Sequence, residues 1–224
     1  MNLNDELKNS ILKTGTSIVG IVCKDGVIMA ADRRATAGNL IISKNTQKVV
    51  QINDYLVMSG TGIASDVDML QKIIAAELKL KELRSKIRPT IKEAANLIGM
   101  IVYRNIRQFS MIPSIAGTLV AGINEGGTAE LYTIEPAGAV SKVDDYDANF
   151  SSGMPFMLGL LERQYKPELS VKEGVNLALE CIKSSTQRDV GSGNAIDVIT
   201  LTKDGIKHEI KQKIEPRFIE ENKK

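Results

Sequence analysis

KTGTSIVG, residues 13–20, joins a polar leader to an apolar strand, and the junction between them is Gly15-Thr16. A threonine hydroxyl is a weak nucleophile unless a base lies beside it. If the Gly15–Thr16 bond is cut, Thr16 gains a free α-amine next to its own hydroxyl. That amine has a reference pKa of about 7.7–8.0, so it can act as a base near neutral pH. Cleavage would thus create a nucleophile and its base on one residue. The alternative is an ordinary Gly-Thr pair at the start of a strand.

The first half of the chain is predicted to form a sheet of β hairpins. Strand-like segments alternate with turns rich in Lys, Asp, Asn and Gly, at residues 16–23, 27–31, 48–52 and 55–59. The first two segments flank the tight turn Lys24-Asp25-Gly26. Because they would pair antiparallel, Asp32 at the end of the second strand is expected near Thr16 at the start of the first.

The rest of the chain alternates between helical and strand periodicity. Helices are predicted from residue 63 to about 86, from Thr90, near Pro155 and after Ser170. Thr90 and Ser170 each begin a capping box. Further strands are predicted at residues 117–123, 129–134, 197–202 and 206–211. This order predicts an α+β fold, a four-layer αββα sandwich with two mainly antiparallel sheets between helical layers.

Composition excludes several classes of function. The 224 residues are 43% hydrophobic, which is enough for a substantial core, and a net charge of +2 argues against binding to nucleic acid or a membrane surface. No apolar run approaches the roughly 18 residues of a membrane span, and the leader has no apolar segment typical of a secretory signal. Cys23 and Cys181 lie far apart without metal-binding spacing, so we interpret them as buried free thiols in a reducing cytoplasm.

The single histidine restricts the possible chemistry further. His208 lies in an alternating stretch and is predicted at the surface of a strand. The chain also lacks a Gly-x-Ser-x-Gly nucleophile elbow, so a serine–histidine–aspartate triad is disfavoured. Zinc sites are equally poorly supplied with ligands, and no metal or cofactor is expected. Hydrolytic chemistry would have to use an amine or a carboxylate as its base.

Four further polar elements are candidates for the surroundings of Thr16. Each also has a simpler interpretation, as surface charge, helix cap or strand end: Asp32-Arg33-Arg34, Lys48, Ser59-Gly60-Thr61-Gly62, and the pair Ser152-Gly153 with residues 188–193. A buried Lys48 paired with Asp32 would lower the pKa of a neighbouring hydroxyl. The glycine-rich junction can present backbone N–H groups to an oxyanion. The alternative interpretation is a dinucleotide-binding fingerprint, which needs a third glycine and a βαβ pattern, and this sequence has neither.

As an ordered set these elements resemble the β subunits of the 20S proteasome, which are N-terminal-nucleophile hydrolases, and the archaeal type most closely. The resemblance covers residue 15 to about residue 215. It is carried by Gly15-Thr16, residues 27–34, residues 44–48, Ser59–Gly62 with Asp66, residues 152–156, residues 187–193 and Asp197-Val198.

The resemblance implies a role for each of these positions. Thr16 would be the nucleophile and its freed amine the base, with Asp32 and Lys48 as the acid–lysine pair and Gly62 as the oxyanion donor. Ser152, Asp189 and Ser192 would surround the amine. Residues 1–15 would be a propeptide removed by the subunit itself, leaving residues 16–224 as one domain. The first specificity pocket would be lined by Ala35, Thr46, Val50, Gly60, Ala64 and Asp68. Gly60 is expected to make it roomy, and Asp68 to favour basic side chains alongside apolar ones.

The same resemblance implies partners and leaves one alternative within the family. The subunit would form stacked heptameric rings with α subunits and other β subunits in the cytoplasm, where a regulatory ATPase delivers unfolded protein. The main alternative is a structural β subunit that assembles but is catalytically silent. A simpler threonine amidase acting alone is a third possibility.

Overall fold

Two five-stranded sheets form the centre of the molecule. The structure, a computed structural model, describes residues 15–111 and 113–215. One sheet has the strand order β10-β1-β2-β11-β12 and contains β1 (Ile18–Cys23), β2 (Gly26–Asp32), β10 (Tyr146–Asp147), β11 (Ala195–Thr202) and β12 (Gly205–Lys213). The other has the order β5-β6-β7-β8-β9 and contains β5 (Val49–Asn53), β6 (Leu56–Gly62), β7 (Ala116–Ile123), β8 (Ala129–Ile134) and β9 (Val140–Val143). Neighbouring strands in both sheets run antiparallel.

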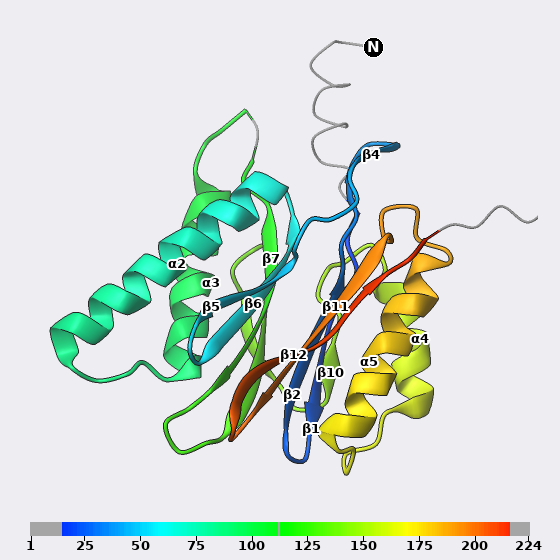
Figure 1. Cartoon of the computed structure of the whole chain (residues 1–224). Helices are drawn as coiled ribbons and strands as arrows, with labels where there is room; N and C mark the ends of the chain where they lie inside the picture. Colours follow the sequence, from blue (N-terminus) through cyan, green and yellow to red (C-terminus); the bar gives the residue numbers. More distant parts are fainter. Residues whose placement is uncertain (1–14, 112, 216–224) are drawn as a thin grey trace, which may run out of the picture.

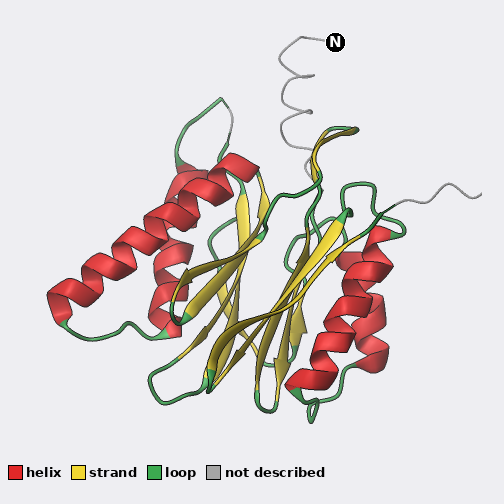
Figure 2. Ribbon diagram, viewed as in Figure 1, coloured by secondary structure: helices red, strands yellow, loops and turns green. Residues whose placement is uncertain are grey.

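Helices cover the outer face of each sheet (Figures 1 and 2). The sheet that contains β6 is covered by α2 (Ala64–Ser85) and α3 (Ile91–Arg107), and the sheet that contains β1 is covered by α4 (Met154–Gln164) and α5 (Val171–Thr186). Helices α3 and α5 begin at the predicted capping boxes. The predicted α+β sandwich is therefore confirmed. None of these described helices is long and apolar enough to cross a membrane.

Three apolar cores separate the four layers, and strand β2 contributes to two of them. Its alternate residues Val27, Met29 and Ala31 belong to the core between the two sheets. The residues between them, Ile28 and Ala30, belong to the core beneath α4 and α5. A strand buried on both faces is apolar at nearly every position, which explains the uninterrupted apolar stretch in this part of the sequence.

Two expectations about the strands need correction. The first-half hairpins do not form one sheet, because β1–β2 and β5–β6 belong to different sheets that pack face to face. Four short strands were also not predicted: β3 (Ala35–Ala37) and β4 (Leu40–Ser43), which form a separate ribbon, and β9 and β10. These strands are two to four residues long, too short to show a periodic pattern.

Candidate active site

The Gly15–Thr16 junction lies at the start of β1 in the uncut chain, with Thr16 only 8% exposed. The Thr16 hydroxyl donates a hydrogen bond to the Gly15 carbonyl oxygen at 2.7 Å, and the same oxygen accepts one from Lys48 Nζ at 3.2 Å. The Gly15 N–H donates to Thr36 Oγ1 at 2.9 Å. A hydroxyl and a cationic donor therefore both contact the carbonyl group that precedes Thr16.

A side chain on Gly15 would disrupt this junction. A Cβ atom at Gly15 would overlap the backbone of Gly191, and a Cβ at Gly191 would overlap Gly15 in turn. The two glycines are thus needed for the close approach of the junction to the loop after α5.

Asp32 connects Lys48 to Ser17, the residue that follows Thr16. The register of β1 and β2 pairs Ile18 with Ala31, which places Asp32 beside Ser17. The fully buried Asp32 carboxylate accepts four hydrogen bonds, from the backbone N–H groups of Ser17 (2.8 Å), Arg34 (2.8 Å) and Gly193 (3.0 Å) and from Lys48 Nζ (2.7 Å). Four donors saturate the carboxylate and fix its orientation.

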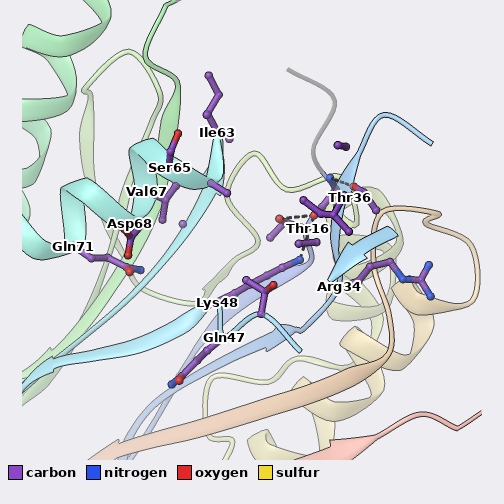
Figure 3. Close-up of a pocket in the computed structure, with 18 residues that line it drawn as sticks. Thr16, Arg34, Thr36, Gln47, Lys48, Ile63, Ser65, Val67, Asp68 and Gln71 are labelled. Carbon is purple, nitrogen blue, oxygen red and sulfur yellow. Dashed lines mark hydrogen bonds between the residues drawn. The ribbon is translucent and has the colours of Figure 1, made fainter. Parts of the chain in front are cut away.

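Lys48 reaches Asp32 from the other sheet, since it immediately precedes β5. Its side chain is 8% exposed, and it extends toward Thr16 in Figure 3. Burial lowers the pKa of Lys48 below its usual value, and the negative charge and hydrogen bond of Asp32 counteract this decrease. The Lys48 amine is thus held in a desolvated position between Asp32 and the Gly15 carbonyl.

Ser152, Asp189 and Ser192 meet on the other side of Thr16. The Thr16 N–H donates to Ser152 Oγ at 2.9 Å. Asp189 Oδ2 accepts hydrogen bonds from Ser152 Oγ at 2.6 Å and from Ser192 Oγ at 2.5 Å. The nitrogen that cleavage would turn into an amine is therefore linked to a carboxylate through one hydroxyl.

A pocket of about 600 Å³ opens beside Thr16 and Lys48 (Figure 3). Of the predicted pocket residues it is lined by Ala35, Thr46, Gly60, Ala64 and Asp68, but Val50 is not among its lining residues. Gly62, the predicted oxyanion donor, lies in the same wall with a φ of +107°, and a Cβ there would overlap the Ile115 carbonyl. The backbone at Gly62 therefore requires glycine.

Several lining residues were missed by the sequence reasoning. They include Arg34, Thr36, Ile42, Gln47, Val67 and Gln71. The helical spacing from Ala64 through Asp68 could have identified Val67 and Gln71, which lie on the same face of α2. The ribbon β3–β4 contributes Ile42, and no local pattern predicted that ribbon.

The expected open space at Gly60 needs correction, and the surroundings of Asp68 bear on the expected charge of the pocket. Gly60 does not leave open space, because a Cβ there would overlap the Val67 side chain. Glycine is required at this position to accommodate Val67. Asp68 is 61% exposed at its side chain and forms an ion pair with Lys72 at 2.6 Å, so water screens its charge.

The other candidate chemistries find little support in the described residues. His208 is exposed on β12, and no cluster of His, Cys, Asp and Glu in residues 15–111 and 113–215 could hold a metal ion. Cys23 and Cys181 are buried and free, as predicted, and burial raises the pKa of each thiol to about 12. Gly60 and Gly62 lie within the antiparallel strand β6, a context that does not fit a dinucleotide fingerprint.

The chain is similar to known proteins over most of its length. A family model described as "Proteasome subunit" matches residues 12–201. The chain is 39% identical to "Proteasome subunit beta" of Nanoarchaeum equitans over 191 residues, covering 85% of this chain and 95% of that protein. It is 39% identical to "Proteasome subunit beta" of Archaeoglobus profundus over 200 residues (89% and 90%) and 38% identical to "Proteasome subunit beta 2" of Pyrococcus abyssi over 191 residues (85% and 88%).

Proposed function

Because this chain belongs to the proteasome subunit family, and within it to the β subunits, we propose that it is an active threonine endopeptidase of the proteasome core. The observation that carries the proposal is the position of the Gly15 carbonyl, which is contacted by Thr16 Oγ1 and by Lys48 Nζ. A silent subunit would not need a buried Lys48 at that carbonyl.

The first step of the proposal is self-cleavage at Gly15–Thr16. The Thr16 hydroxyl attacks the Gly15 carbonyl carbon, the bond to the Thr16 nitrogen breaks, and the hydroxyl proton moves to that nitrogen. The product is an ester on Thr16 Oγ1 with a free α-amine. Water then hydrolyses the ester, which releases a leader ending in the Gly15 carboxylate. Residues 1–14 of this leader lie outside the described residues.

The second step is hydrolysis of a substrate peptide bond. The freed amine accepts the Thr16 hydroxyl proton while Oγ1 bonds to the substrate carbonyl carbon, and the leaving amine takes that proton as the C–N bond breaks. Water hydrolyses the resulting ester. Lys48 lowers the pKa of the hydroxyl by its charge, and the Gly62 backbone is proposed to stabilise the oxyanion.

An endopeptidase with little sequence selectivity must be kept away from folded proteins. We therefore propose that residues 16–224 form one domain that assembles with α subunits and other β subunits in stacked heptameric rings. Unfolded protein would be delivered to the enclosed Thr16 by a regulatory ATPase, in the cytoplasm.

Co-assembly with α subunits tests the proposed activity. We expect intact-mass measurement to show that the mature chain begins at Thr16, and the same particles to hydrolyse fluorogenic peptides. Turnover should decrease as the pH falls below the pKa of the amine, because only the neutral amine can accept the proton. Particles that retain residues 1–15 and hydrolyse nothing would identify a silent subunit. A cleaved chain that remains a monomer would identify a separate amidase.

Asp68 is expected to have little influence on the cleavage preference. Asp68→Asn should change the ratio of cleavage after basic and apolar residues by less than about twofold, because exposed ion pairs such as Asp68–Lys72 are screened by water. A peptide panel on assembled particles measures this ratio. A selective loss of cleavage after Arg and Lys would contradict this expectation and restore Asp68 as the recognition group.

A further inference from the structure

Three serine hydroxyls meet behind Thr16, and for two of them, Ser17 and Ser185, the sequence predicts no role. Ser17 precedes β1, Ser185 lies in the last turn of α5, and Ser192 lies in the loop after α5. All three residues are completely buried. Ser17 Oγ lies 2.6 Å from Ser192 Oγ and also contacts Ser185 Oγ. The cluster joins the nucleophile strand to the helix that precedes Asp189.

The direction of these hydrogen bonds follows from their last acceptor. An ionised carboxylate can only accept hydrogen bonds, so Ser192 donates its single hydroxyl proton to Asp189. Ser192 can then only accept from Ser17, and Ser17 in turn accepts from Ser185. The result is a hydrogen-bond chain in which each hydroxyl donates in one direction, from Ser185 through Ser17 and Ser192 to Asp189. The same rule makes Ser152 donate to Asp189 and accept from the Thr16 nitrogen.

Gly153 packs directly against this hydrogen-bond chain. A Cβ on Gly153 would overlap both Ser17 Oγ and Ser185 Oγ. Its N–H donates to the Thr16 carbonyl oxygen at 3.2 Å. The start of α4 is thus packed directly against the hydroxyls, which are shielded from water and keep their protein partners. A buried hydroxyl that loses its partner is costly, so the chain resists rearrangement.

We propose that Ser17 and Ser185 are positioning residues, whose hydroxyls hold Ser192 and Asp189 so that Ser152 orients the freed amine of Thr16. Ser17 is the central member, because its N–H also donates to Asp32 Oδ1 at 2.8 Å. One residue thereby links the Asp32–Lys48 side of the site to the Asp189–Ser152 side. This inference rests on the proposed threonine protease activity.

Removing the hydrogen-bond chain of serines should make the freed Thr16 amine more basic. Lys48, before β5, contacts the Gly15 carbonyl next to Thr16, and the charged groups that act on Lys48 are Asp32 at the end of β2, Arg34 after β2 and Asp189 after α5. All four remain when Ser17 or Ser185 is replaced. With weaker donation to Asp189, its negative charge is less compensated and favours the protonated amine. The acid limb of the kcat/KM profile should therefore move to higher pH.

The test uses full-length chains co-assembled with α subunits and a fluorogenic peptide. Ser17→Ala should still be cleaved to begin at Thr16, because the amine forms only after that step. Its turnover should fall about 5–10-fold, the usual effect of one or two lost hydrogen bonds. The midpoint of the acid limb of its kcat/KM profile should move up by roughly half a pH unit. Ser185→Ala should give the same changes at about half the size. Ser184→Ala, which removes a half-buried serine one position earlier in α5, should match the wild type.

The double variant distinguishes positioning from general destabilisation. Because Ser185 acts through Ser17, Ser17→Ala combined with Ser185→Ala should be no slower than Ser17→Ala alone. If Ser17→Ala does not assemble, the milder Ser185→Ala still reports the acid limb. Additive losses, or an acid limb at the wild-type pH in Ser185→Ala with normal turnover, would overturn the inference. An inactive wild-type particle that keeps its leader would instead overturn the proposed function, and the inference with it.

Discussion

Thr16→Ala should leave residues 1–15 attached in assembled particles and reduce peptide hydrolysis to background. Without the hydroxyl that contacts the Gly15 carbonyl, neither self-cleavage nor ester formation can occur. We expect a loss of at least about 10³-fold in kcat, the scale on which removing a nucleophile acts. Intact-mass measurement and a fluorogenic peptide assay report the two steps separately.

Thr16→Ser is the matched control, because it keeps the hydroxyl and removes only a methyl group. It should be cleaved at the same bond and retain measurable turnover. If the alanine variant is trimmed after Gly15 in particles with no other active subunit, self-cleavage is not the route by which the leader is removed.

Lys48→Ala should strongly reduce turnover while the particle still assembles. The variant loses the cation that contacts both Asp32 and the Gly15 carbonyl, so the Thr16 proton becomes harder to remove. We expect a decrease of about 10²–10⁴-fold in kcat. Asp32 retains three backbone donors but loses its counter-charge, which should cost up to about 3 kcal/mol of stability, measured by thermal unfolding.

Two lysine variants serve as controls for this result. Lys48→Arg keeps the charge but should not restore turnover, because a planar guanidinium cannot replace a compact ammonium in a closed space. Lys44→Ala removes an exposed lysine from the same segment and should have no effect. Near-normal turnover in Lys48→Ala or Lys48→Arg would remove Lys48 from the proposed machinery.

The sequence predicted the parts of the fold that depend on local patterns. Long periodic helices, capping boxes and the β1–β2 hairpin follow from short-range signals, and the hairpin alone places Asp32 beside Ser17, next to Thr16 in the sequence. Which sheet each hairpin joins depends on packing between the sheets, and no local pattern reports it. For that reason local patterns alone predict one sheet for the first-half strands, where the molecule has two.

The same distinction applies to the site. Lys48 reaches Asp32 across the interface between two sheets, so the sequence offers this pair as one candidate beside ordinary surface charge, and the family resemblance favours it. Gly60 suggested an open pocket because a glycine shows no side chain, yet Val67 from the next helix fills that space. Ser17 and Ser185 gave no signal at all. Their contact exists only because α5 packs on β1 and β2.

The contacts at the Gly15–Thr16 junction would also determine the kinetic order of the proposed self-cleavage. The attacking hydroxyl and the carbonyl it contacts belong to adjacent residues of one chain, and Lys48 of the same chain is already in place. Maturation by this route is a first-order process, whose half-time is independent of the concentration of particles. Each subunit would then be cleaved at its own rate, and diluting the particles would not slow the cleavage.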